Sequence, residues 1–391
     1  MPDIDLSPVS SESSDADSPA PALALCLSGG GYRAMLFHAG VLWRLAELGY
    51  LGSTERQGKH GLLGSLQRVS SVSGGSITSA VLALAWPSLE VDGSGLPERF
   101  RRQVIDPVQC FASQSTISIG SGLWAALVST INKRIVKVYR KKLYGEKTLQ
   151  HLPDHPRFIF NATNLQSGAL WRFSKTYSRD WRVGEIKTPN DSIASVIAAS
   201  SAFPPFLSPA CFKYDESAYT ADSGADLQRP PYTTRPVLSD GGVYDNLGLE
   251  TAYKRCRTLI VSDAGGTFKA ADKVHGDWAR QSYRVLNTID NQVRSLRKRQ
   301  LLAALTRQER LGTFFSIRGD IAKYPAPDKL DCPLERTQAL ASIATDLAAK
   351  DVATQRRLIN WGYAICDAGV RAWVEDGLPP PGDFPFPAEG V

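Results

Sequence analysis

The stretch LALCLSGGGYRA, residues 23–34, places a short apolar run directly before three glycines. All residues from Leu23 to Leu27 are apolar, as is typical of a parallel strand buried on both faces. After the glycines, apolar residues recur at helical spacing from Arg33 to Leu48. The stretch therefore predicts a buried strand, a tight glycine turn and a helix.

The same order of elements returns further along the chain. Leu66–Val72 is a second strand candidate, followed by a turn of small residues and a helix from about Ser76 to Ala85. Further strands are expected at 157–162, 170–174, 235–239 and 258–262, with a helix near 192–200 and predominantly helical segments over 281–310 and 334–374. Alternating strands and helices predict an α/β fold whose mostly parallel sheet carries helices on both faces.

Length and composition are those of a globular protein. The chain has 391 residues, of which 43% are apolar and 21% charged, which excludes a mainly disordered chain and a polytopic membrane protein. Without residues 1–20, which hold five acidic side chains and no basic one, 45 basic residues face 34 acidic ones. A positive body indicates an anionic partner.

We expect three regions along the chain. Residues 1–20 form a disordered acidic, serine-rich tail, residues 21–376 one domain with a helical extension from about 281, and residues 377–391 a proline-rich tail. The N-terminus lacks a secretory signal pattern, and the six cysteines are scattered without a CxxC pair. The expected location is cytoplasmic, at the inner face of a membrane.

The segment Ser71–Ser76 (SVSGGS) resembles a G-x-S-x-G nucleophile elbow in which serine replaces the first glycine. Such a strand-to-helix turn needs tiny residues around Ser73, and the amides of the following helix favour negative charge there. The alternative is a structural Ser/Gly loop with an N-cap serine.

Gly29, Gly30 and Gly31 leave backbone amides uncovered, as required for binding an anion. One such chemistry is dinucleotide binding, but the third Rossmann glycine is replaced by Ala34 and no acidic residue ends the next strand. The loop therefore indicates an oxyanion site or a structural turn.

A serine nucleophile needs a base. Asp240, at a predicted strand end and followed by Gly241 and Gly242, is placed to accept the proton directly, and Asp263 is a near copy of this arrangement. His275 would complete a Ser–Asp–His order, but no strand precedes it to aim its ring, and His38 lies on the first predicted helix.

The order of these motifs resembles that of the patatin-like phospholipases, a family related to cytosolic phospholipase A. Leu27–Ala34 is similar to the family's oxyanion loop, Val72–Gly75 to its elbow and Asp240–Gly242 to the second half of its Ser–Asp dyad. Two further segments, 160–164 and 198–206, are also similar, so the resemblance spans about residues 22–266. Ser71 and Ala34 depart from the family's pattern.

The resemblance implies a three-layer α/β/α fold with additional C-terminal helices that hydrolyses acyl esters of lipids without a metal, calcium or other cofactor. Ser73 would attack the ester carbonyl while Asp240 takes its proton. The Gly29, Gly30 and Gly31 amides would hold the oxyanion, and Arg33 would assist through its charge. The elbow and turn glycines of this site are Gly74, Gly75, Gly241 and Gly242.

Residues 117–144 pair an apolar stretch with a basic one, in which six of the ten residues from Lys133 to Lys142 are basic. This pattern suits an interfacial anchor on anionic lipid, or a core helix followed by a solvated basic helix. Arg294, Arg297, Lys298 and Arg299 form a second basic cluster, read as a solvated face. No motif indicates nucleic-acid binding.

These patterns favour a serine lipid acyl hydrolase of phospholipase A or lysophospholipase type. Its partners would be a phospholipid or lysophospholipid substrate and an anionic membrane surface. Two alternatives remain. One is a soluble carboxylesterase or thioesterase using a Ser73–Asp240–His275 triad, and the other is a membrane-docking protein with a vestigial site.

Overall fold

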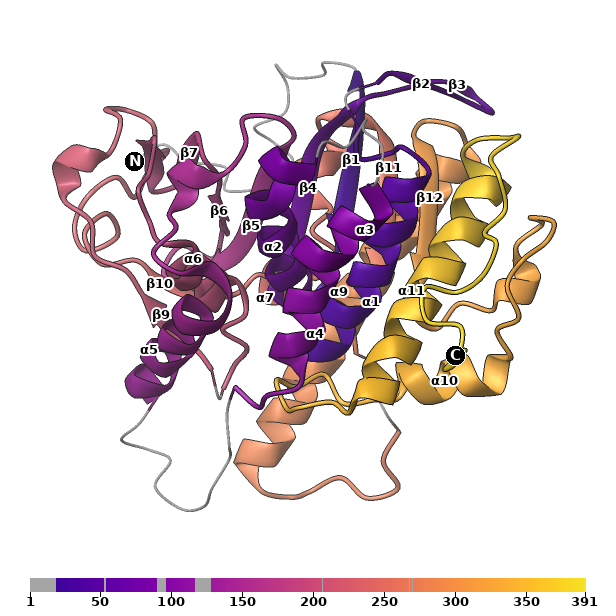
Figure 1. Ribbon diagram of the computed structural model, residues 1–391. Coiled ribbons are helices and arrows are strands. Elements are labelled where there is room, and N and C mark those ends of the chain that lie inside the picture. The colour runs from indigo at the N-terminus through magenta and orange to yellow at the C-terminus, as the bar shows by residue number, and fades with distance from the viewer. Residues whose placement is uncertain are drawn as a thin grey trace.

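The computed structural model describes residues 19–52, 54–89, 96–116, 128–205, 207–266, 268 and 270–391. At its centre, the described residues form a sheet of ten strands with β12-β11-β1-β4-β5-β6-β7-β8 along its main path, and β10 pairs with both β5 and β9 (Figure 1). The strands are β1 (Ala20–Leu27), β4 (Leu66–Val72), β5 (Arg157–Asn164), β6 (Leu170–Phe173), β7 (Tyr177–Asp180), β8 (Gly184–Lys187), β9 (Ala210–Cys211), β10 (Val237–Asp240), β11 (Cys256–Asp263) and β12 (Leu311–Ser316). A separate hairpin joins β2 (Arg56–Gly58) to β3 (Gly61–Gly64).

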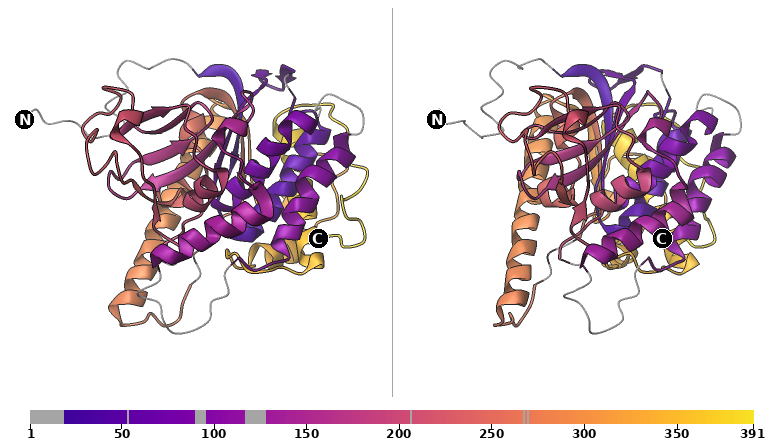
Figure 2. Two further views of the ribbon diagram at one scale, coloured as in Figure 1. Left: turned by 60° about the vertical axis from the view of Figure 1, so that its left-hand side comes forward. Right: turned by 90° about the vertical axis from the view of Figure 1, so that its left-hand side faces the viewer.

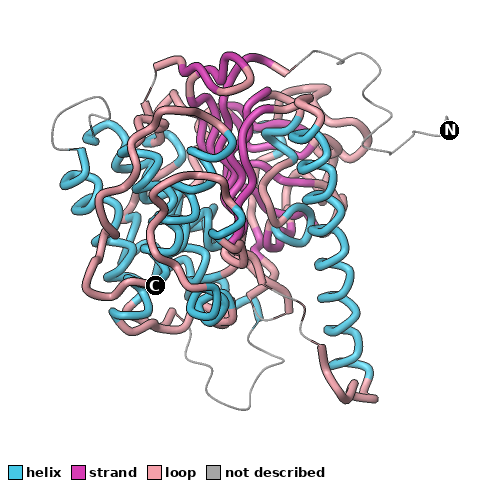
Figure 3. The backbone as a smooth tube through the Cα atoms, turned by 90° about the vertical axis from the view of Figure 1, so that its right-hand side faces the viewer, coloured by secondary structure: helices cyan, strands magenta, loops and turns pink. Residues whose placement is uncertain are grey.

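Helices cover both faces of the sheet, as the tube view also shows (Figure 3). They are α1 (Gly31–Glu47), α2 (Ser73–Leu89), α3 (Leu96–Phe100), α4 (Asp106–Ala112), α5 (Val128–Tyr139), α6 (Ile193–Ser200), α7 (Gly242–Asp245), α8 (Glu250–Tyr253), α9 (Trp278–Thr306), α10 (Leu334–Ala341) and α11 (Val352–Trp373). No helix in the described ranges is long and apolar enough to cross a membrane.

The sequence of β1 explains the three layers. Leu23, Leu25 and Leu27 belong to the large core under α1, α2 and α11, whereas Ala24 and Cys26 alternate with them into a second core. This second core includes side chains of α8 and of the C-terminal half of α9. A strand buried on both faces is apolar at every position, because each face meets its own helical layer.

The mostly parallel sheet predicted from the sequence is confirmed. Strands β12, β11, β1, β4 and β5 run parallel, and β6, β7 and β8 continue from β5 as an antiparallel meander. The end of this meander (β7 and β8) and strand β12 were not predicted, because these short strands contain polar residues and glycine and so carry a weaker signal than the apolar run of β1.

The segment 334–374 is predominantly helical, as predicted, and it is interrupted once. Helix α10 ends at Ala341 and α11 begins at Val352, because the intervening segment uses its carbonyl groups to hold the glycine loop: Arg33 donates to the carbonyl of Ile343, and the Tyr32 N–H donates to that of Asp346. The proline-rich end is packed against the domain, since Asn360 donates to the carbonyls of Phe386 and Gly390. Residues 1–18 of the predicted tail lie outside the described residues.

The closest helix contact in the fold is between α1 and α11, and glycines permit it. A Cβ on Gly40 would lie 1.9 Å from the carbonyl oxygen of Ile359, and one on Gly362 would lie 1.9 Å from that of Phe37. The two backbones therefore touch without side chains between them.

We expect Gly40→Ala to lower the free energy of unfolding by about 1–3 kcal/mol, the usual cost of overpacking, even though alanine favours helix by itself. Urea denaturation measures the change. Gly382→Ala is the matched control, because no atom lies within 4 Å of its added Cβ. A Gly40→Ala variant as stable as the wild type would contradict the close crossing.

Candidate active site

The site lies where the order of the parallel strands reverses. Strand β1 lies between β4 and β11, and the glycine loop, Ser73 and Asp263 follow the carboxyl ends of these three strands. In open α/β sheets, this switch point leaves a crevice in which ligands bind.

Strand β5 brings Ser73 and Asp240 together. Along one of its edges, β5 pairs with β4 as far as Asn161, which lies opposite Val72. From Ala162 onward the same edge pairs with β10, and Asp240 lies opposite Ala162. The other edge is occupied by β6 over the same residues, so β10 must follow β4 along a single edge. The chain turns away at Ser73 at the level where β10 ends.

Ser73 has the strained backbone of a nucleophile elbow. Its φ of 49° is left-handed, which is uncommon for a residue other than glycine, and it is the first residue of α2. A Cβ on Gly74 would come within 2.2 Å of the Gly31 carbonyl oxygen, and one on Gly75 within 2.6 Å of that of Leu27. Only glycine lets the elbow lie this close to the glycine loop and to the end of β1.

A buried hydroxyl network supports the elbow from behind. Ser200 accepts the Ser73 N–H at 3.1 Å and donates its hydroxyl to the carbonyl of Asn161 at 2.7 Å. Ser71, which stands where the family pattern has glycine, accepts a hydrogen bond of 3.1 Å from Ser76. The serine is accommodated because its hydroxyl has a partner in this network.

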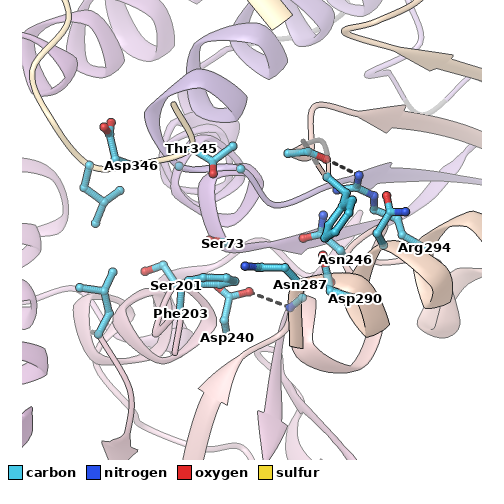
Figure 4. A pocket seen from close by; sticks show the side chains of 18 of the residues that line it. Ser73, Ser201, Phe203, Asp240, Asn246, Asn287, Asp290, Arg294, Thr345 and Asp346 are labelled. Atoms are coloured by element: carbon cyan, nitrogen blue, oxygen red, sulfur yellow. Dashed lines mark hydrogen bonds between the residues drawn. The ribbon is translucent and has the colours of Figure 1, made fainter. Parts of the chain in front are cut away.

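Asp240 is buried, and only one of its two carboxyl oxygens accepts a hydrogen bond from a described residue, so the other is uncommitted. Its Oδ1 accepts the Gly242 N–H at 2.7 Å, whereas no described residue hydrogen-bonds to Oδ2. Burial raises its pKa to about 7, outweighing the Gly242 N–H and the nearby Ser73 hydroxyl, which both favour the charged form. A carboxyl in this state can exchange a proton near neutral pH. Figure 4 shows Ser73 and Asp240 at the floor of the pocket.

Two of the three predicted loop amides are available to a ligand. The Gly29 N–H donates to the carbonyl of Asn246 at 3.1 Å, whereas no residue in the described ranges accepts from the N–H of Gly30 or Gly31. Both of these glycines have positive φ values, 142° and 60°, and both line the pocket.

Arg33 faces away from the pocket. Its guanidinium donates to the carbonyl oxygens of Ala341 and Ile343 at 2.7 Å and of Ala264 at 2.8 Å. Burial, followed by the charge of Arg318, lowers its pKa to about 10. The side chain ties the start of α1 to two other segments and does not line the pocket.

The rival bases are not brought to Ser73. Asp263 does not line the pocket, and its Oδ1 accepts the Gly265 N–H at 2.9 Å. His38 is buried between Ser262 and the Ser28 carbonyl, and burial lowers its pKa to about 4. His275 is exposed beside Arg280. All five histidines are described and none lines the pocket.

The pocket above Ser73 has a volume of about 550 Å³. Sequence reasoning missed most of its walls, which are Asn246, the segment 345–348 and one polar face of α9. That face comprises Arg284, Asn287, Asp290, Asn291 and Arg294 (Figure 4). Their spacing of three to four residues is visible in the sequence, but only the fold places them over the serine.

The predicted membrane anchor is described only in part. Its apolar half, residues 117–127, lies outside the described residues. The basic half forms α5 and a following π-helical turn, in which Ile135 is buried while Lys133, Arg134 and Lys137 are exposed. The second basic cluster contributes to internal contacts, since Arg294 is buried and Arg297 forms an ion pair of 2.9 Å with Glu250.

A family model described as patatin-like phospholipase matches residues 25–253. Among solved structures, human GIVD cytosolic phospholipase A2 aligns with a TM-score of 0.49 and 13% identity, covering 88% of this chain and 58% of that one. VipD from Legionella pneumophila aligns with a TM-score of 0.34 and 14% identity, over 88% of this chain and 65% of that one. This chain thus spans less than two thirds of either structure. No curated protein matches it significantly.

Asp240→Asn should change how stability depends on pH. Folding raises the carboxyl pKa from 3.8 to about 7, so between these values the folded state binds more protons than the unfolded state, and stability falls as the pH rises. The variant lacks this titration. We therefore expect the unfolding free energy of the variant, relative to that of the wild type, to increase by about 2–4 kcal/mol between about pH 4.5 and pH 8. Urea denaturation at each pH measures this difference. An advantage independent of pH would contradict the raised pKa.

Proposed function

This chain belongs to the patatin-like phospholipase family, and on that premise we propose that Ser73 and Asp240 act as its catalytic dyad. Family membership supports a lipid acyl hydrolase in general. The finer proposal is the cleavage of fatty acyl esters of glycerophospholipids or lysophospholipids through an acyl-enzyme. It is carried by one observation, namely that the uncommitted oxygen of a buried Asp240 lies beside a serine on a strained elbow.

In the proposed reaction, Asp240 accepts the proton of the Ser73 hydroxyl as the oxygen attacks the ester carbonyl. The oxyanion then lies against the N–H groups of Gly30 and Gly31, at the start of α1, where the helix dipole favours negative charge. Asp240 returns the proton to the leaving alcohol, and a water molecule activated in the same way releases the fatty acid. Arg33 is a positioning residue, since its guanidinium holds the loop in place.

The pocket walls support a lipid substrate. Phe203, Leu207 and Leu347 provide apolar surface near Ser73, which suits an acyl chain, and the polar face of α9 suits a head group or glycerol. An anionic membrane surface is proposed as the partner, since α5 presents exposed basic side chains on the sheet's pocket side. The Ser–Asp–His alternative loses support because His275 is exposed and outside the pocket.

The dyad is tested by the release of free fatty acid from vesicles of phosphatidylcholine and phosphatidylglycerol in EDTA. We expect Ser73→Ala and Asp240→Asn each to lower the rate by at least about 10³-fold, the scale seen when a member of a nucleophile–base unit is removed. Asp263→Asn, with circular dichroism to check folding, is the matched strand-end control and should retain activity. Release that survives loss of Ser73 would refute the dyad, and a folded wild type without release would indicate a vestigial site.

The raised pKa of Asp240 also predicts a pH profile. Only the carboxylate can act as base, so kcat/KM on a monomeric short-chain ester should rise with pH through a single ionisation near the value of about 7. A soluble ester avoids changes in the charge of the vesicles. A profile already level at about pH 5 would contradict the raised pKa of Asp240, because an aspartate with an ordinary pKa is ionised there.

A further inference from the structure

Helix α9 has its polar and apolar sides reversed relative to an ordinary surface helix. The side toward the pocket is the polar face described above, from Arg284 to Arg294. A helix on a globular domain normally turns its apolar side inward. The apolar residues of the N-terminal half of α9 must therefore lie elsewhere on the helix.

They lie on the side away from the protein. Trp278, Val285, Ile289 and Leu296 follow each other at intervals of seven, four and seven residues, which places them in one line along the helix. Their exposed fractions are 81%, 53%, 55% and 57%. We call these four residues the outer stripe. Trp278 is the most exposed large apolar side chain in the described part of the protein.

The outer stripe also stands clear of the rest of the molecule. Figure 2 shows the N-terminal half of α9 (orange) projecting beyond the body at the bottom of both views. Val274, just before the helix, is 56% exposed as well. Large apolar side chains exposed along one side of a helix mark a contact with a membrane or another protein.

We propose that the outer stripe enters the interface of an anionic lipid bilayer and so holds the pocket against its substrate. This inference rests on the function proposed above. Tryptophan and aliphatic side chains flanked by basic residues are typical of helices that bind in the interface. From residue 273 to residue 299 the chain carries seven basic and two acidic residues, and of the basic ones Lys273, Arg280 and Arg299 are exposed, a charge complementary to anionic head groups.

The same charge disfavours a second copy of the chain as the occupant. Pairing two outer stripes would bring two strongly basic segments together, and like charges repel across an interface. A bilayer also explains why the polar face lies inward. The pocket is on one side of α9 and the lipid on the other, so a phospholipid needs to pass a single helix, about 10–12 Å in diameter, to enter the pocket.

The test uses the double variant Trp278→Ser/Ile289→Ser in the full chain. Binding to vesicles of phosphatidylcholine and phosphatidylglycerol is measured by flotation, and hydrolysis is measured on the same vesicles and on monomeric p-nitrophenyl butyrate. We expect vesicle affinity to fall at least about tenfold, the scale set by the apolar area of the two side chains. Vesicle hydrolysis should fall in parallel, while hydrolysis of the soluble ester stays within about twofold of the wild type.

The matched control is Trp373→Ser/Leu62→Ser. These side chains are 48% and 39% exposed, and they lie at the amino ends of the parallel strands, where the β2–β3 hairpin contacts the end of α11. The control should bind vesicles like the wild type. Circular dichroism and thermal melting exclude unfolding of either double variant.

The outcomes separate the two proposals. The inference is supported if the Ser73→Ala variant still binds vesicles and the outer-stripe variant does not. Equal vesicle binding by the wild type and the outer-stripe variant overturns it. It is also overturned if light scattering shows that the wild type is an oligomer and the outer-stripe variant a monomer. If the wild type hydrolyses neither substrate, the proposed function is refuted. Vesicle binding by the wild type and the outer-stripe variant then tests the outer stripe alone.

Discussion

The site depends on how β5 shares one of its edges. Strand β4 pairs with β5 as far as Asn161, and β10 then takes the same edge from Ala162 in the opposite direction. Two strands that meet end to end must both leave the sheet at the same place, and Ser73 and Asp240 are the residues at which they do so. Neither side chain needs a long reach or an intervening ring, because the backbone hydrogen bonds of the sheet already set their separation.

Such close approach of backbones has a cost, because it is possible only at residues without side chains. Gly31, Gly74 and Gly75 lie where backbones touch, and any Cβ there would overlap a carbonyl oxygen. Asp240 carries a cost of another sort, since its burial disfavours the carboxylate. Both costs fall at the proposed site, while the two apolar cores on either side of β1 supply the stability.

The sequence was sufficient for those parts of the site that are local. A buried strand followed by small residues and a helix is legible at both Leu23–Leu27 and Leu66–Val72, since burial on two faces demands apolar residues at every position. The antiparallel direction of β10, the hydrogen bond that removes the Gly29 N–H and the approach of segment 345–348 could not be predicted. They depend on contacts between residues far apart in the chain, for which no local pattern exists. The interruption between α10 and α11 depends on contacts of the same kind.

Arg33 holds its neighbours through their carbonyl groups, and Tyr32 likewise donates its N–H to the carbonyl of Asp346. Every amino acid has a carbonyl, so these contacts place no demand on which side chains stand at 341, 343 or 346. Those positions lie beyond residue 253, where the family match ends. Side chains at these positions can therefore change without removing the hydrogen bonds that hold the glycine loop, as long as the main chain keeps its path. In this molecule, the family match covers the strands and turns of the site, whereas main-chain groups outside that match help to hold the glycine loop.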